Sequence, residues 1–306
     1  MLRSVILAAS RSSRMERLVE TAPYTRGVVR RFVAGTTNTD ALSVTRTLVD
    51  DGMTVSLDYL SEDTVTPEQA VAARDEYLAL LAALATAGQT PAAEVSLKLS
   101  ALGQGFDEQL AYEHARAICA AAVEAGTTVT LDMEDHTTID STLDTLVRLR
   151  HDYPSTGVAL QAYLRRTESD CRELATVGSR VRLCKGAYRE PESVAYQSMR
   201  DVNKSYVRCM NILMSGPGYP MVATHDSRLI AIGEDRARWF DRGADEFEFQ
   251  MLYGIRPDEQ ARLAAEGYTV RLYLPYGTDW YGYLMRRIAE RPSNLVFFAR
   301  ALTMKG

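Results

Sequence analysis

Residues 94–134 read EVSLKLSALGQGFDEQLAYEHARAICAAAVEAGTTVTLDME, and this segment holds two β-rich runs with a helical stretch between them. Apolar residues alternate with others in both runs, at 94–100 and 128–134, as they do in strands. The intervening residues 107–124 are rich in alanine and are soon followed by Gly126, which is typical of a helix and its C-terminal end. The segment therefore predicts two parallel strands joined by a helix.

The same unit recurs along most of the chain. Further helical stretches lie at 67–87, which begins at a proline and stops at Gly88, and at 193–214, before Gly216. Eight such units in about 250 residues predict a closed (β/α)8 barrel. A doubly wound sheet is the alternative, but eight repeats are many for it and no GxGxxG motif follows a strand. The eight β-rich runs are TVSLDYL (54–60), EVSLKLS (94–100), TVTLDME (128–134), GVALQAY (157–163), RVRLCK (180–185), MVATHD (221–226), EFEFQML (246–252) and TVRLYLP (269–275).

The first 50 residues do not follow this repeat. They indicate two or three helices ahead of the barrel, and no low-complexity linker separates them from it. We therefore expect an N-terminal helical extension at 1–50 and the barrel at 51–306.

Composition narrows the classes of function. The chain has 306 residues, 46% of them hydrophobic and 25% charged, and no apolar run long enough to span a membrane as a helix. Its net charge is −5, whereas a nucleic-acid-binding protein normally has a basic excess, so we expect no nucleic-acid partner. The four cysteines form no CxxC pair, which disfavours a zinc site or redox dithiol and is typical of the reducing cytoplasm.

The first 39 residues depart from the overall charge, because they hold seven arginines against two glutamates. Such a local excess could face a nucleic acid or an anionic lipid surface, although a solvated helical face is the more common explanation.

Polar side chains are concentrated where the predicted strands end. In a barrel of this kind the C-terminal ends of the strands carry the chemistry. Lys98 stands out, because it lies between Leu97 and Leu99 and must point away from both, into the barrel or its mouth. The other candidates at strand ends are Asp58, Tyr59, Ser100, Asp132, Glu134, Asp135, His136, Gln161, Tyr163, Arg182, Lys185, Gly186, Tyr188, Thr224, His225, Asp226, Gln250 and Tyr273.

The last predicted helix, at 281–290, carries a polar stripe. Tyr283, Arg286, Arg287 and Glu290 lie within about 100° of one another on a helix of 3.6 residues per turn. The stripe is compatible with a solvent face that holds an Arg286–Glu290 pair. It is also compatible with a paired-arginine clamp for a carboxylate, with Glu290 binding a cationic group of the same ligand.

Several chemistries fit such a mouth. A Schiff-base lyase would use Lys98 or Lys185. A metal-dependent hydrolase would need more ligands than His136, His225 and scattered carboxylates supply. A flavin or other phosphate-bearing cofactor would use Arg182, Lys185 and the backbone near Gly186. A non-catalytic binding barrel remains a further alternative, and the residues alone indicate a mouth suited to a small amino-acid-like anion.

The chain also resembles the flavin-dependent proline dehydrogenases, and its length is similar to that of the short monofunctional bacterial members. The resemblance runs from the second strand to near the C-terminus, in order along the chain. It rests on VSLKLSALG (95–103), TLDMEDH (130–136), GVALQAYLRR (157–166), RLCKGAYREP (182–191), ATHD (223–226), FEFQMLYGIR (247–256) and RLYLPYGTDWYGYLMRRIAERPSN (271–294).

The resemblance implies a distorted (β/α)8 TIM-like barrel with a final helix over the C-terminal face. It also implies FAD as cofactor, no metal, and oxidation of L-proline to Δ1-pyrroline-5-carboxylate by hydride transfer to flavin N5. The electrons would pass to a membrane quinone, which implies a cytoplasmic protein with peripheral contact at the inner face of the cell membrane. The basic N-terminal segment is the candidate for that contact.

The family's residue roles carry over where the motifs match. Arg286, Arg287 and Lys98 would hold the proline carboxylate, and Glu290 would lie near the ring nitrogen. Tyr273, Tyr283, Asp132 and Leu252 would shape the pocket, and Ala187 would border the substrate. The cofactor-binding set would be Gln161, Arg182, Cys184, Lys185, Gly186, Thr224 and His225, with Arg182 close to flavin N5. The family commonly has valine where this chain has Cys184, and no redox chemistry is assigned to that thiol.

Overall fold

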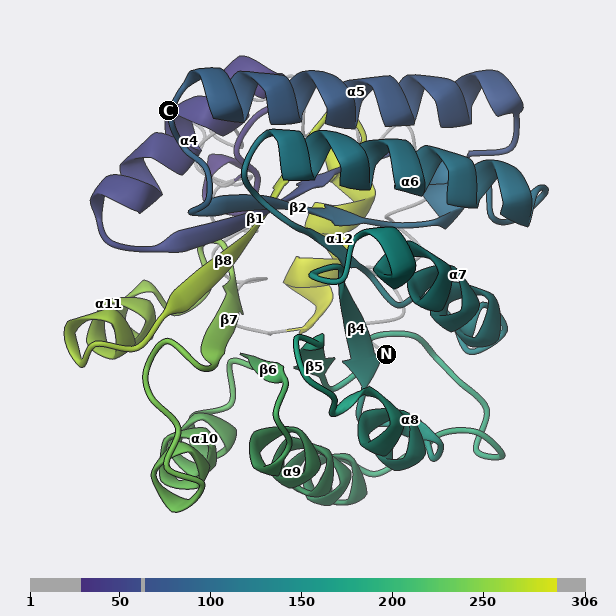
Figure 1. The fold of residues 1–306 in the computed structure, drawn as a ribbon. Helices are drawn as coiled ribbons and strands as arrows, with labels where there is room; N and C mark the ends of the chain where they lie inside the picture. The colour runs from purple at the N-terminus through teal and green to yellow at the C-terminus, as the bar shows by residue number, and fades with distance from the viewer. Residues whose placement is uncertain (1–28, 62–63, 291–306) are drawn as a thin grey trace, which may run out of the picture.

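The strands form one closed, all-parallel barrel. The computed structural model describes residues 29–61 and 64–290, with side chains as far as 285. Each strand pairs with its neighbours in chain order, and the eighth closes onto the first, which confirms the predicted (β/α)8 barrel (Figure 1). The strands are β1 (Thr54–Tyr59), β2 (Ala93–Leu97), β3 (Val129–Leu131), β4 (Gly157–Gln161), β5 (Arg180–Cys184), β6 (Tyr219–Ala223), β7 (Glu248–Leu252) and β8 (Val270–Tyr276).

Helices surround the strands (Figure 1). Large apolar side chains of the helices and strands, such as Tyr77, Leu80 and Leu57, are fully buried between the two layers. The hydrophobic core therefore lies outside the ring of strands and leaves the interior to other residues. The helices are α4 (Asn38–Asp50), α5 (Pro67–Thr86), α6 (Glu108–Glu124), α7 (Ile139–Asp152), α8 (Thr167–Leu174), α9 (Met199–Ser215), α10 (Ser227–Trp239), α11 (Pro257–Ala265) and α12 (Trp280–Glu290), with a short 3-10 turn η1 (Ser100–Leu102).

The ends of α5 and α6 follow the signals in the sequence. Thr66 and Gln69 form a capping box at the start of α5, with Pro67 in its first turn, and Asp107 accepts a hydrogen bond from the Leu110 amide at the start of α6. Both helices are thus close to their predicted bounds.

The start of α9 differs from the prediction. We expected a helix from residue 193, but α9 begins at Met199, where Ser198 caps it. The preceding residues are taken up by backbone hydrogen bonds to the segment after β4: Tyr196 N donates to Tyr163 O over 2.7 Å, and Arg165 N donates to Val194 O over 2.9 Å. Long-range pairing therefore overrides the local helical pattern there.

The N-terminal helical extension stays a prediction. Helix α4 is one helix ahead of the barrel, while residues 1–28 lie outside the described residues. Phe32 and Val33 pack with Trp280, Tyr281 and Leu284 of α12 in a second apolar cluster. In the described part of the chain, no helix is long and apolar enough to cross a membrane.

Helix α12 lies over the end of the barrel where the strands terminate. Its apolar residues pack on Leu60, just after β1, and on Ile255 and Leu252 at the end of β7. In projection α12 lies over the middle of the ring of strands (Figure 1). The predicted final helix over the C-terminal face is confirmed.

Candidate active site

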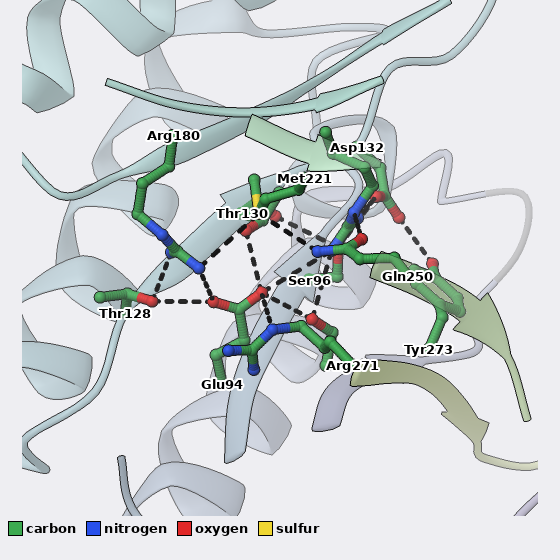
Figure 2. Close-up of polar contacts among 12 residues, drawn as sticks. Glu94, Ser96, Thr128, Thr130, Asp132, Arg180, Met221, Gln250, Arg271 and Tyr273 are labelled. Carbon is green, nitrogen blue, oxygen red and sulfur yellow. Dashed lines mark hydrogen bonds and ion pairs between the residues drawn. The ribbon is translucent and has the colours of Figure 1, made fainter. Parts of the chain in front are cut away.

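The interior of the barrel is charged rather than apolar, and Glu94, near the start of β2, joins several of its polar side chains (Figure 2). The Glu94 carboxylate is 1% exposed and accepts hydrogen bonds from Ser56 Oγ over 2.6 Å and from Arg180 Nη2 over 2.8 Å. Nitrogens of Arg182 and Arg271 lie 3.7 and 3.9 Å from Glu94 Oε1. Burial alone would raise the pKa of Glu94, but the three arginines outweigh burial and hold that pKa well below its usual range.

A second carboxylate, Glu248 on β7, lies with Glu94 in the layer of charged side chains farther from the mouth. Its Oε1 accepts from Arg271 Nε over 2.8 Å and from Gln250 Nε2 over 2.5 Å, and its side chain is fully buried. Gln250 also accepts from Arg182 Nε over 2.6 Å. The amide of Gln250 thus joins Glu248 to the next layer, nearer the mouth.

Arg182 and Asp132 form the next layer. Arg182 Nη1 donates to Asp132 Oδ1 over 2.6 Å, and Tyr273 OH donates to Asp132 Oδ2 over 2.6 Å. Ser96 Oγ accepts from Arg182 over 2.7 Å, and Ser56 Oγ accepts from it over 3.2 Å. Partners on several other strands therefore hold the guanidinium in one orientation, which residues of one strand alone could not do.

Of these charged residues, Lys98 lies nearest the mouth of the barrel. Its Nζ donates to Asp58 at the end of β1, so the direction predicted from its apolar neighbours is confirmed. Together the interior pairs four cations with four carboxylates. The cations are Lys98, Arg180, Arg182 and Arg271, and the carboxylates are Asp58, Glu94, Asp132 and Glu248.

The candidate cofactor residues stand at the ends of β4, β5 and β6. Gln161 Nε2 donates to the carbonyls of Met133 and Glu134 over 3.1 and 3.0 Å. Its Oε1 is buried and has no hydrogen-bond partner among the described residues. A buried acceptor without a partner is costly, so this atom suits a donor on a ligand.

Lys185 and His225 are oriented by neighbouring groups. Lys185 Nζ lies 2.8 Å from Asp226 Oδ2, and Asp226 in turn caps α10. His225 Nε2 accepts from the Leu252 amide over 2.9 Å, which places the proton of a neutral ring on Nδ1. Thr224, which is buried, accepts from the Asp226 amide over 3.1 Å.

Cys184 is the remaining polar side chain of the cofactor-binding set. Burial raises the pKa of its thiol to about 11, so it stays protonated and unreactive near neutral pH. This environment agrees with assigning it no redox chemistry.

The backbone angle at position 186 and the nearby ring of Tyr163 explain why a glycine follows Lys185. The φ of Gly186 is +107°, and a Cβ there would lie 2.3 Å from the ring of Tyr163. We therefore expect Gly186→Ala to reduce the free energy of unfolding by more than the roughly 1–2 kcal/mol of left-handed strain alone. Chemical denaturation measures this loss.

Gly88→Ala is the matched control for that substitution. Gly88 has a φ of +65° but nothing within 4 Å of its Cβ position. An equal loss of stability in the two variants would show that the approach to Tyr163 adds no cost.

The residues expected around a substrate are only partly described. Tyr273 and Asp132 meet inside the mouth, Tyr283 of α12 belongs to the second apolar cluster, and Leu252 packs against that cluster. Ala187 is exposed beside Gly186. The side chains of Arg286, Arg287 and Glu290 lie outside the described residues, so the clamp stays a prediction.

The geometry disfavours the alternative chemistries. Lys98 and Lys185 are both ion-paired, and an ammonium held by a carboxylate is not a nucleophile. For a metal site, His136 instead bonds to Glu190, and no group of three potential metal ligands occurs in the described part of the chain.

Several residues of the interior were missed as site residues from the sequence. Glu248 and Arg271 lie two positions before Gln250 and Tyr273, and Glu94 lies four positions before Lys98, so the two-residue period of a strand would have placed them inside the barrel. Glu190 gives no such signal, because it lies in the loop after β5. It accepts from the His136 amide over 3.0 Å and from Tyr163 OH over 3.3 Å.

Comparisons with known proteins identify the family of the chain. A family model described as Proline dehydrogenase matches residues 41–300. The chain is 37% identical over 305 residues to Proline dehydrogenase 1 of Bacillus subtilis (strain 168), with 100% of both chains covered. It is 40% identical over 309 residues to a proline dehydrogenase of Deinococcus radiodurans, covering 99% of this chain and 98% of that one.

A solved structure shares the fold. The barrel superposes on proline utilization A (PutA) from Bdellovibrio bacteriovorus with a TM-score of 0.82 at 22% identity, covering 98% of this chain and 39% of that one. Full-length similarity to curated relatives, the family match and the shared barrel lead to one conclusion. The chain belongs to the proline dehydrogenase family of enzymes.

Proposed function

We propose that this protein oxidises L-proline to Δ1-pyrroline-5-carboxylate with FAD as cofactor. The observation that carries the proposal is the meeting of Lys98, Asp132, Arg182 and Tyr273 at the mouth of a barrel of this family. These groups offer a cation for a carboxylate and a rigid polar wall beside it, which a small cyclic amino acid requires.

The described residues fit the proposed cofactor. The unpartnered Gln161 Oε1 would accept from a ring N–H, and the Gly186 backbone is a further candidate contact. The other candidates for binding FAD are Arg182, Cys184, Lys185, Thr224 and His225. When bound, FAD supplies an acceptor for the hydride that leaves proline.

The chain's own residues would orient the substrate. Lys98, Arg286 and Arg287 hold the carboxylate, and Glu290 lies near the ring nitrogen. Tyr273, Tyr283, Leu252, Asp132 and Ala187 shape the pocket around the apolar ring. Fixing both ends of so small a molecule lowers the entropic cost of reaching the reactive geometry.

The visible absorption spectrum of the purified protein tests the proposal, recorded anaerobically before and after addition of L-proline. A flavin spectrum that bleaches with proline would support cofactor and substrate together. A flavin spectrum that ignores proline would contradict the substrate. A colourless protein that cannot be reconstituted with FAD would contradict the whole proposal.

Removing one arginine of the clamp should weaken substrate binding. We expect Arg286→Ala or Arg287→Ala to cost about 2–5 kcal/mol of proline binding, because a buried carboxylate then loses a charged partner. Titration of the flavin spectrum with L-proline measures this loss, and FAD content should survive. Loss of FAD with unchanged proline affinity would contradict the role.

The electron acceptor is proposed as a membrane quinone, reached by peripheral contact on the cytoplasmic side. The arginine-rich residues 1–39 are the candidate contact, since they contain seven arginines and two glutamates. Co-sedimentation with anionic liposomes should fall when these residues are removed, and undiminished binding would contradict the assignment.

A further inference from the structure

Asp58 and Lys98 form a pair whose two ends differ in exposure. Asp58 lies opposite Ser96 in the pairing of β1 with β2, so Lys98 stands two residues nearer the mouth. The Asp58 side chain is 1% exposed, while that of Lys98 is 25% exposed. The carboxylate is thus buried, and the lysine side chain is partly exposed.

Other charged groups surround this ammonium from several strands. Asp132 and Glu134, at and beyond the end of β3, face it, and Arg182 of β5 and Tyr273 of β8 contact Asp132. Asp132 is already bound by Arg182 and Tyr273, and Glu134 by Ser100. Asp58 is therefore the carboxylate in direct contact with Lys98.

The balance of these groups decides the charge of Lys98. Burial by itself would lower the pKa of Lys98, but Asp58 and then Asp132 outweigh burial and raise that pKa above its ordinary value. Without the Asp58 carboxylate, burial opposes the charge with less compensation, and the lysine loses the partner that fixes its direction.

We propose that Asp58 is a positioning residue for substrate binding, which holds Lys98 in its charged form and aims it at the carboxylate of the substrate. The inference rests on the proposed function, because it needs a carboxylate at the mouth. Asp58 itself touches no substrate, since Lys98 lies between it and the opening.

The first experiment measures inhibition by cyclopentanecarboxylate, which has proline's ring and carboxylate but no amine to oxidise. Its neutral amide, cyclopentanecarboxamide, is the matched ligand. We expect Asp58→Asn to weaken inhibition by cyclopentanecarboxylate about tenfold at pH 9 and much less at pH 6.5. Inhibition by the amide should be unchanged at both pH values. The pH dependence follows because the lysine of the variant loses its proton at lower pH than that of the native enzyme.

The second experiment needs no substrate. Competitive acetylation with acetic anhydride, followed by mass spectrometry, gives the pKa of Lys98 in the holoenzyme. We expect that pKa to fall by about three units in Asp58→Asn, because a tenfold loss at pH 9 requires most of the lysine to be deprotonated there. This readout stays informative if L-proline is not the substrate, so the inference and the proposed function can fail separately.

Two further variants guard against a general structural effect. In Lys98→Met, adding Asp58→Asn should weaken inhibition by cyclopentanecarboxylate no further. The double variant also avoids leaving the Asp58 side chain as an unpaired buried carboxylate. Asp170→Asn makes the same change at another buried, ion-paired aspartate, on α8, and should leave the preference for carboxylate over amide unchanged. Equal weakening of inhibition by the carboxylate and by the amide in Asp58→Asn would overturn the inference, as would an unchanged pKa of Lys98.

Discussion

Glu94→Gln should destabilise the protein by about 3–5 kcal/mol, the usual cost of removing one partner from a buried ion pair. The carboxylate lies among three arginines that have little access to water, so its loss leaves buried positive charge uncompensated. Glutamine keeps the shape and can still accept from Ser56, so the change isolates the charge. Urea unfolding monitored by circular dichroism measures the difference.

The same variant should alter the acid limb of the stability profile. The pKa of Glu94 is held well below its ordinary value of 4.5, so the ionised carboxylate stabilises the fold fully above pH 4.5. That contribution is lost progressively as the pH falls from 4.5 towards the lower pKa of the folded state. The stability difference between the native protein and Glu94→Gln should therefore shrink over this range.

A second substitution supplies the control. Arg271→Met in the Glu94→Gln background removes a cation along with the anion, although it leaves Glu248 without one partner. We expect the double variant to lose less than the sum of the two single losses, because the three groups interact. Strict additivity would contradict the view that Glu94 acts by compensating these arginines.

Asp132→Asn should lower the rate of proline-dependent flavin reduction by about 10²–10³-fold, the typical effect of removing one fixed polar group from an active site. The carboxylate accepts from Arg182 and Ser96 at one oxygen and from Tyr273 at the other. Asparagine has one oxygen, so its NH2 group must face a donor. Arg182 would then lose its ion-pair partner at Asp132, one of the groups that fix its orientation beside the proposed cofactor.

Tyr273→Phe separates orientation from a general loss of polarity. It removes the contact at Asp132 Oδ2 and leaves the pair of Asp132 with Arg182 in place. Stopped-flow reduction with L-proline should therefore fall much less than in Asp132→Asn. Equal losses in the two variants, at equal FAD content, would contradict the positioning of Arg182 by Asp132.

The eight strands could be predicted because each is a short local pattern. Alternation of apolar residues and the spacing of glycines are properties of a few neighbouring residues, and they survive in the folded chain. The start of α9 could not be predicted in this way. Residues such as Tyr196 pair with the segment after β4, which lies far away in the sequence, and that pairing outweighs helical propensity.

The position of the candidate site could be predicted from the sequence, but its network of side-chain contacts was less predictable. Lys98 could be aimed into the barrel from its apolar neighbours, but its partner Asp58 depends on the register of β1 with β2. Arg182 likewise could be assigned from its motif, whereas its contacts with Gln250 and Ser56 require the closure of the barrel. Such contacts between distant strands carry no signal in a single sequence.

The matched charges inside the barrel constrain how this protein can evolve. A change at Glu94 or Arg271 alone leaves a buried charge uncompensated, so descendants that alter one are expected to alter the other as well. Side chains at the mouth are constrained by the ligand instead, so they can change one at a time. New substrate preferences should therefore arise around α12 and the strand ends, above an interior inherited as a unit.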